Sequence, residues 1–234
     1  MTENTEQKEE FSKTGPVSKE PLLAASTEKE SFSNTLPSSN SNEPTQISNR
    51  LLQAKTTSTS LDSSIHHCDF NEGEPFNGIF AYLTKKNSGN PHTKGCIYIS
   101  ASSTLGNHPW QVIDPGWTSH WVSDNAPDQW IRFDFKTARV ILTYYTLKTY
   151  NYVAGGNHMK SWVVEGSSSD NDWLEIDRRQ STNDLNDKFA VKTFKCKNSS
   201  SFRYYRIRQT GKTHCESDMM ALTSVEFFGT YRDE

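Results

Sequence analysis

Aromatic and amide side chains that could bind a ligand gather in two stretches of the chain that we interpret as loops. Trp110, Trp117 and His120 lie in the first stretch, and Asn157 and His158 lie in the second. Tryptophan and histidine rings can stack on sugar rings or anchor a partner, and an asparagine amide both donates and accepts hydrogen bonds. These five residues are the predicted ligand contacts. Packing inside the domain is the alternative for the two tryptophans.

No spacing typical of a catalytic site stands out. The run EGSSS at 165–169 lacks the glycines of a nucleophile elbow, and the run GKT at 211–213 follows a strand instead of a phosphate-binding loop. Close acids such as Asp170 and Asp172 fall in a turn, where carboxylates are usually solvated. We therefore expect a protein that is not an enzyme. A hydrolase fragment, which would need paired carboxylates, is an alternative.

Cysteine usage and the first residues bear on the compartment. The chain has four cysteines, and none of them has the C-x-x-C spacing of a zinc knuckle. The start, MTENTEQKEE, has neither the basic region nor the apolar core of a signal peptide, so we expect a cytoplasmic protein with free thiols. No apolar run reaches about 18 residues, so no membrane span is expected.

Composition divides the 234 residues into two parts. The formal net charge is -3, which argues against a nucleic-acid-binding protein. Residues 1–64 contain Phe11 and Phe32 as their only aromatic residues and are rich in Ser, Thr, Asn and Glu, so we predict a disordered tail. Within it, 47–54 (ISNRLLQA) is interpreted as a stretch of linker, with a short helix or docking motif as the alternative. A scaffold whose tail carries the function is a further possibility.

The periodicity of apolar residues changes along the rest of the chain. Phe76, Ile79, Phe80 and Leu83 repeat at helical spacing, so 65–95 is predicted to hold a short helix and a lead-in loop. From residue 97 the period becomes two. Strands are predicted at 97–100, 129–135, 140–150, 161–166, 173–177, 189–196, 204–209 and 222–228. Turn residues separate these runs and no helices alternate with them, which indicates an all-β fold, an antiparallel β-sandwich or jelly roll.

The order of several motifs resembles the discoidin, or coagulation factor 5/8 type C, domain over residues 96–231. ISASST at 99–104 is similar to that family's opening strand, and VIDPGWTSHW at 112–121 is similar to its Asp-to-Trp loop. QWIRFDF at 129–135 and SWVVEGSSSDNDWLEI at 161–176 are similar to its middle strands. RYYRIRQTG at 203–211 and LTSVEFFG at 222–229 are similar to its last two. FNGIFAYLTKKNSGNPHTKG and GGNHMKSWVVEGS most resemble the intracellular, often BTB-linked branch of the family.

The resemblance implies a galactose-binding-like β-sandwich that recognises a protein or glycan ligand through loops at one end. Sugar-binding relatives often hold a structural calcium ion in the loop that corresponds to 114–119. In this sequence Asp114, Ser119 and Glu226 would be its oxygen ligands, and Pro115 stands where the family has glycine. No other cofactor is implied.

Overall fold

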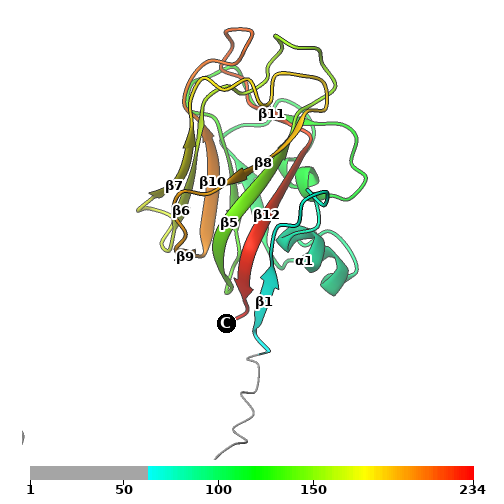
Figure 1. The fold of residues 1–234 in the computed structure, drawn as a ribbon, viewed down its shortest axis with the longest axis vertical. Helices are drawn as coiled ribbons and strands as arrows, with labels where there is room; N and C mark the ends of the chain where they lie inside the picture. The colour runs from blue at the N-terminus through cyan, green and yellow to red at the C-terminus, as the bar shows by residue number, and fades with distance from the viewer. Residues whose placement is uncertain (1–62) are drawn as a thin grey trace, which may run out of the picture. The chain divides into compact units, whose positions relative to one another are not determined.

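The structure is a computed structural model that describes residues 63–234 (Figure 1). The predicted disordered tail, apart from residues 63 and 64, and the segment 47–54 lie outside the described residues. Within 63–234, no helix is both long and apolar enough to cross a membrane.

Two antiparallel sheets of five strands each build the described domain. In the first sheet the order is β1 (Ile65–Cys68), β12 (Ser224–Arg232), β5 (Arg139–Lys148) and β8 (Val191–Lys195), and β9 (Ser201–Phe202) also pairs with β5. In the second sheet the order is β2 (Tyr98–Ala101), β4 (Trp130–Asp134), β10 (Tyr204–Gln209), β6 (Trp162–Ser167) and β7 (Leu174–Arg179). A separate short pair joins β3 (Trp121–Val122) to β11 (Ala221–Leu222). The predicted all-β antiparallel sandwich is confirmed.

The period-two pattern of the sequence explains which side chains fill the space between the sheets. Along β4, Ile131 and Phe133 are buried, whereas Arg132 between them is half-exposed. Phe133 packs against Phe227 of β12, with ring centroids 4.9 Å apart. These contacts join the two sheets, because β4 and β12 belong to different layers of the sandwich. Burial of such aromatic side chains is a dominant source of core stability.

One α-helix, α1 (Ile79–Asn87), covers part of the sandwich. Its buried residues are Ile79, Phe80 and Leu83, and the Phe80 ring lies 5.0 Å from that of Phe227. The predicted apolar stripe is therefore confirmed for these three residues. Phe76, the fourth, lies before the helix and is 37% exposed.

A buried carboxylate fastens this helix to the first sheet. Glu226 of β12 accepts hydrogen bonds from the backbone N–H groups of Phe80 at 2.8 Å and Ala81 at 3.1 Å. It also accepts one from its own neighbour Phe227 at 2.8 Å. The first N–H groups of a helix have no partners within the helix, so an acid at this position satisfies them.

The sandwich begins earlier in the chain than the sequence indicates. Residues 65–95 were expected to contain a helix and a loop, but β1 (Ile65–Cys68) pairs with β12 along its whole length. The sequence IHHC has no apolar alternation, so periodicity gives no sign of this strand. The predicted boundary at residue 96 is therefore wrong, because the first sheet includes β1. Periodicity likewise does not indicate β3, β9 and β11, because each of these strands has only two residues.

Candidate functional site

A group of aromatic and polar side chains lies among the loops that follow β5 and β10, at the end of the sandwich away from the C-terminus (Figure 1). Tyr150 is at its centre. The Tyr150 ring centroid lies 4.9 Å from His120, 4.9 Å from His158 and 5.9 Å from Tyr152. We call His120, Tyr150, Tyr152, Asn157, His158 and Cys215 the loop-end cluster.

Hydrogen bonds join three separate loops at this cluster. The backbone N–H of Asn157 donates to the Tyr150 hydroxyl at 2.8 Å. The side-chain Oδ1 of Asn157 accepts from the Cys215 thiol at 2.8 Å, which ties in the loop after β10. The N–H of Gly155 donates to Asn186 Oδ1 at 2.8 Å, which ties in the loop after β7. These loops are therefore held in one arrangement before any ligand arrives.

Close packing explains one of the glycines in this region. A Cβ atom added at Gly156 would lie 2.5 Å from a ring carbon of Tyr152 and 2.9 Å from the Tyr150 hydroxyl. Real side-chain carbons do not approach this closely. The two tyrosine rings can therefore stack over this turn only because residue 156 has no side chain.

Two members of the cluster keep bonding capacity for a ligand. Tyr152 is 54% exposed, and the neighbouring Val153 is 65% exposed. The ring of His120 is half-buried, and neither of its nitrogens bonds to another residue in the described part of the chain. Desolvation by burial lowers the pKa of His120, so the ring is neutral at pH 7 and presents one donor and one acceptor.

Two of the predicted ligand contacts have a different role. His158 is fully buried, and its Nε2 lies 3.1 Å from the carbonyl oxygen of Tyr152 and 3.2 Å from that of Val153. Asn157 uses Oδ1 for Cys215 and its own N–H for Tyr150. The prediction of ligand contact is therefore wrong for His158, because no part of it reaches the surface. Both residues hold the loop in shape.

Trp110 makes its ring contacts with residues outside the loop-end cluster. It belongs to a short 3₁₀ helix, η1 (Pro109–Ile113). Its ring is stacked between two histidines, with centroids 5.6 Å from His92 and 5.7 Å from His108. Among the described residues, neither of these ring contacts of Trp110 is with His120, although both residues were assigned to the same predicted loop.

The three predicted calcium ligands have other partners. Both oxygens of Glu226 accept backbone N–H bonds, as described above. Asp114 accepts a hydrogen bond from the amide of Asn90, and the Ser119 hydroxyl accepts one from Asn107 at 3.3 Å. Calcium requires several free oxygen donors that converge on one point. The residues present do not fit a calcium site, because Glu226 would have to give up its bonds to the helix.

The outer face of the second sheet carries a second group of aromatic and charged side chains. Arg206 and Arg208 share the carboxylate of Glu165, through bonds of 2.6 Å from Arg206 Nε and 3.0 Å from Arg208 Nη2. The guanidinium of Arg206 lies 4.2 Å from the centre of the Trp173 ring. Burial opposes ionisation of Glu165, but the two guanidinium groups outweigh it and lower its pKa. We call Trp130, Arg132, Glu165, Trp173, Arg206 and Arg208 the outer sheet face.

Sequence reasoning missed three members of the loop-end cluster. Tyr150 was placed in a strand, Tyr152 was not singled out, and Cys215 was expected only to be a free thiol. The available signal was the run Tyr-Asn-Tyr at 150–152 followed by Gly155-Gly156, in which bulky rings precede a turn with little side chain. All four cysteines are free in the structure, and Cys215 is exposed.

Comparisons with known proteins identify similar solved structures but no family. No family model matches the chain, and no curated protein does. A CBM32 module from Clostridium perfringens in complex with GalNAc-beta-1,3-galactose aligns with a TM-score of 0.47 and 16% identity over 58% of this chain and 97% of that one. The family 32 CBM of C. perfringens NanJ in complex with galactose aligns with a TM-score of 0.47 and 12% identity over 61% of this chain and 97% of that one.

A third solved structure is the C-terminal domain of a chitobiase from Bacteroides fragilis, with a TM-score of 0.48 and 18% identity over 60% of this chain and 97% of that one. The fold assignment rests on the strand pairing described above.

Proposed function

We propose that this protein is a non-catalytic binding module that recognises a glycan through the loop-end cluster. The observation that carries the proposal is that an exposed ring, Tyr152, and a neutral imidazole, His120, both pack against the buried ring of Tyr150. The loops that hold them are fixed by hydrogen bonds to one another, so a ligand would not have to order them.

The chemistry of these two side chains suits a sugar. One face of a pyranose ring consists of C–H groups, which pack on an aromatic ring such as that of Tyr152. Sugar hydroxyl groups both donate and accept hydrogen bonds, and neutral His120 offers one acceptor and one donor. Tyr152 therefore supplies contact area, and the hydrogen bonds of His120 fix the orientation of the sugar.

The charge of the cluster argues against an ionic ligand. The cluster contains no Asp, Glu, Lys or Arg, and the lowered pKa of His120 keeps that ring neutral at pH 7. A strongly charged partner would find no counter-ion among these residues. A partner protein with an apolar or hydroxyl-rich surface is the second ligand class to be tested.

The side chains of the loop-end cluster also support the proposal that the site is not catalytic. Glycosidases place two carboxyl groups about 5 to 10 Å apart on either side of the bond to be broken. The loop-end cluster, among the described residues, has no carboxylate to supply this chemistry. Turnover of a model glycoside that is lost when one acid is mutated would favour the hydrolase alternative.

We also propose a cytoplasmic location. It is supported by the four unpaired cysteines, of which Cys68 and Cys196 are partly buried thiols whose pKa burial raises to about 11 and about 12. Membership of the intracellular, BTB-linked branch of discoidin-like domains stays a prediction. Localisation of the tagged full-length chain in cells would test the compartment.

A glycan array probed with the full chain tests the function, followed by calorimetry with the best hit. We expect Tyr152→Ala to weaken binding about tenfold, because an aromatic stacking contact is worth roughly 1 to 1.5 kcal/mol. The matched control is Tyr98→Ala, which removes a 47% exposed ring from the edge strand β2. EDTA should not change the glycan affinity of either variant.

Three outcomes would contradict the proposal: no glycan binds, Tyr98→Ala weakens binding as much as Tyr152→Ala, or EDTA abolishes it. If a cellular protein is captured instead, and Tyr152→Ala releases it, the ligand class would be a protein at the same site.

A further inference from the structure

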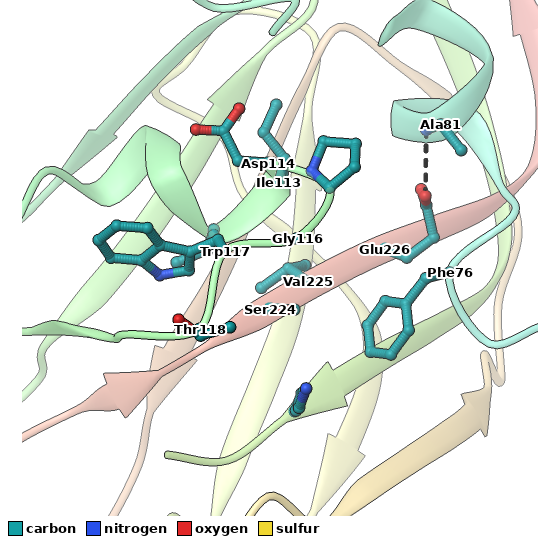
Figure 2. A pocket seen from close by; sticks show the side chains of 13 residues that line it. Phe76, Ala81, Ile113, Asp114, Gly116, Trp117, Thr118, Ser224, Val225 and Glu226 are labelled. Carbon is teal, nitrogen blue, oxygen red and sulfur yellow. Dashed lines mark hydrogen bonds between the residues drawn. The ribbon is translucent and has the colours of Figure 1, made fainter. Parts of the chain in front are cut away.

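A cavity of about 330 Å³ lies between the loop after η1, helix α1, β12 and the end of β5 (Figure 2). It shares no residue with the loop-end cluster. Most of its wall is apolar and is formed by Phe76, Ala81, Val112, Ile113, Pro115 and Val225. A volume of this size is at the lower end of the range of about 300 to 1,000 Å³ found for small-molecule sites, so its ligand would be small.

A buried hydrogen-bond donor at this cavity has no partner. Trp117 lines the cavity, and its indole Nε1 is buried without a hydrogen bond to any residue in the described part of the chain. The indole N–H is a donor and never an acceptor. The Nε1 atom has almost no accessible surface, so a ligand oxygen in the cavity reaches the N–H only after the indole turns toward it. Pairing the N–H then recovers the free energy that leaving it unpaired away from water costs.

A second unpaired group in the wall is positively charged. Lys148, the last residue of β5, lines the cavity and makes no ion pair with any described acid. Its ammonium lies 5.1 Å from the centre of the Phe189 ring. An aromatic face attracts a cation but does not neutralise its charge. The cavity therefore offers a positive charge to an anionic group.

The two acids that line the cavity are already engaged. Glu226 gives both oxygens to backbone N–H groups of Phe80, Ala81 and Phe227, and burial raises its pKa to about 7. Asp114 accepts a bond from Asn90, and Figure 2 shows its carboxylate pointing away from Glu226. The unused bonding capacity at this site consists mainly of donors, which favours a ligand that accepts.

We propose that this cavity binds a small organic acid with an apolar body of phenyl or short alkyl size. The body contacts Ile113, Pro115 and Val225, and the carboxylate accepts the Trp117 N–H and neutralises Lys148. The site does not depend on the proposed glycan function, because its walls and the loop-end cluster have no member in common.

Calorimetry with 4-phenylbutyrate, and with the uncharged 4-phenylbutan-1-ol for comparison, tests the proposal on the full chain. We expect saturable one-to-one binding of the acid and binding of the alcohol about tenfold weaker, as expected when one charge-assisted hydrogen bond is lost. Lys148→Met should weaken the binding of 4-phenylbutyrate about tenfold. Trp117→Phe should weaken it about fivefold, because phenylalanine keeps an aromatic ring but has no N–H donor.

Matched controls separate these effects from general damage. Lys195→Met removes an exposed lysine from β8 of the same sheet, and Trp110→Phe removes an indole N–H outside the cavity. Neither should change the affinity. Ala81→Leu should abolish binding by filling the space, since the backbone N–H of residue 81 can still bond to Glu226. Thermal unfolding of every variant checks that it is folded.

The proposal is overturned if 4-phenylbutyrate does not saturate, if the alcohol binds as tightly, or if Lys195→Met weakens binding as much as Lys148→Met. It is also overturned if a folded Ala81→Leu variant binds normally. Tyr152→Ala is expected to leave this affinity unchanged, so a failure here and a failure of the glycan proposal are distinguishable.

Discussion

The loop-end cluster and the outer sheet face both combine aromatic and polar side chains. They differ in how many of these side chains already have partners within the protein. On the sheet face, Glu165 takes both Arg206 and Arg208, and the guanidinium of Arg206 covers the ring of Trp173. At the loop end, the ring of Tyr152 is open to solvent and both nitrogens of His120 lack a partner among the described residues.

This difference shows that residue types alone do not identify a binding surface. Arginines beside tryptophans on a strand can suggest a site for an acidic ligand, but the structure gives these arginines an acid from the neighbouring strand β6. A ligand would have to break those pairs. The loop end differs because the ring of Tyr152 and the nitrogens of His120 are available to a ligand, and the loops that hold them are fixed by hydrogen bonds.

The largest effect that would test this contrast is on stability. Glu165→Gln should lower the free energy of unfolding by about 2 kcal/mol at pH 7, because two half-buried arginines lose their charged partner. Ligand affinity at the loop end should not change. Urea unfolding of the variant and of Glu175→Gln, an exposed acid paired three residues away with Arg178, gives the comparison. The control should cost less than about 0.5 kcal/mol.

The pH dependence of this first effect has a definite sign. The pKa of Glu165 is lower in the folded protein, so its stabilisation is present above its ordinary pKa of about 4.5 and is lost as the pH falls through the folded value. The gap between wild type and Glu165→Gln should therefore narrow in acid. A gap that stays constant down to pH 2 would contradict the shared ion pair.

An intermediate effect is expected on ligand affinity alone. Gly156→Ala places a carbon 2.5 Å from the Tyr152 ring, so the loop must move and affinity should fall about tenfold. Gly211→Ala is the matched control at the same end, because its new carbon would lie an ordinary 3.5 Å from Ser161 Cβ. Calorimetry distinguishes the two. Equal losses for both glycines would show that rigidity of the tyrosine pair is not what matters.

The smallest effect is a pH dependence of binding that the outer sheet face does not share. Burial lowers the pKa of His120, so affinity should be constant from pH 8 to about 6.5 and fall a few-fold as the pH drops through the folded value. Calorimetry at pH 7.5 and pH 5 measures this. His120→Gln keeps a donor and an acceptor without titrating, and it should remove the dependence. A dependence that persists in His120→Gln would assign it to another group.

Periodicity in the sequence was sufficient for the long strands. Runs such as 129–135 and 204–209 alternate apolar and polar residues, and they became β4 and β10 within one or two residues. Period-two burial is a local property, so sequence can report it.

Long-range contacts explain what the sequence could not predict. Nothing near Glu226 indicates that its partners are backbone groups of Phe80 and Ala81, about 145 residues earlier in the chain. Likewise, Asn157 and His158 look like ligand contacts in sequence, and only packing against Tyr150 and Cys215 assigns them to loop structure. The roles of these two residues are set by neighbours from other parts of the chain, which the local sequence does not show.

The pairing of β1 with β12 has a consequence for any shortened form of this protein. A chain that starts at residue 96, where the family-like motifs begin, would lack Ile65–Cys68 and leave the edge of β12 that faces β1 unpaired along Gly229–Arg232, while the opposite edge stays paired with β5. It would also lack α1 and so deprive the Glu226 carboxylate of two of its donors. An uncapped strand edge is a template for pairing between molecules, so such a fragment should aggregate during purification.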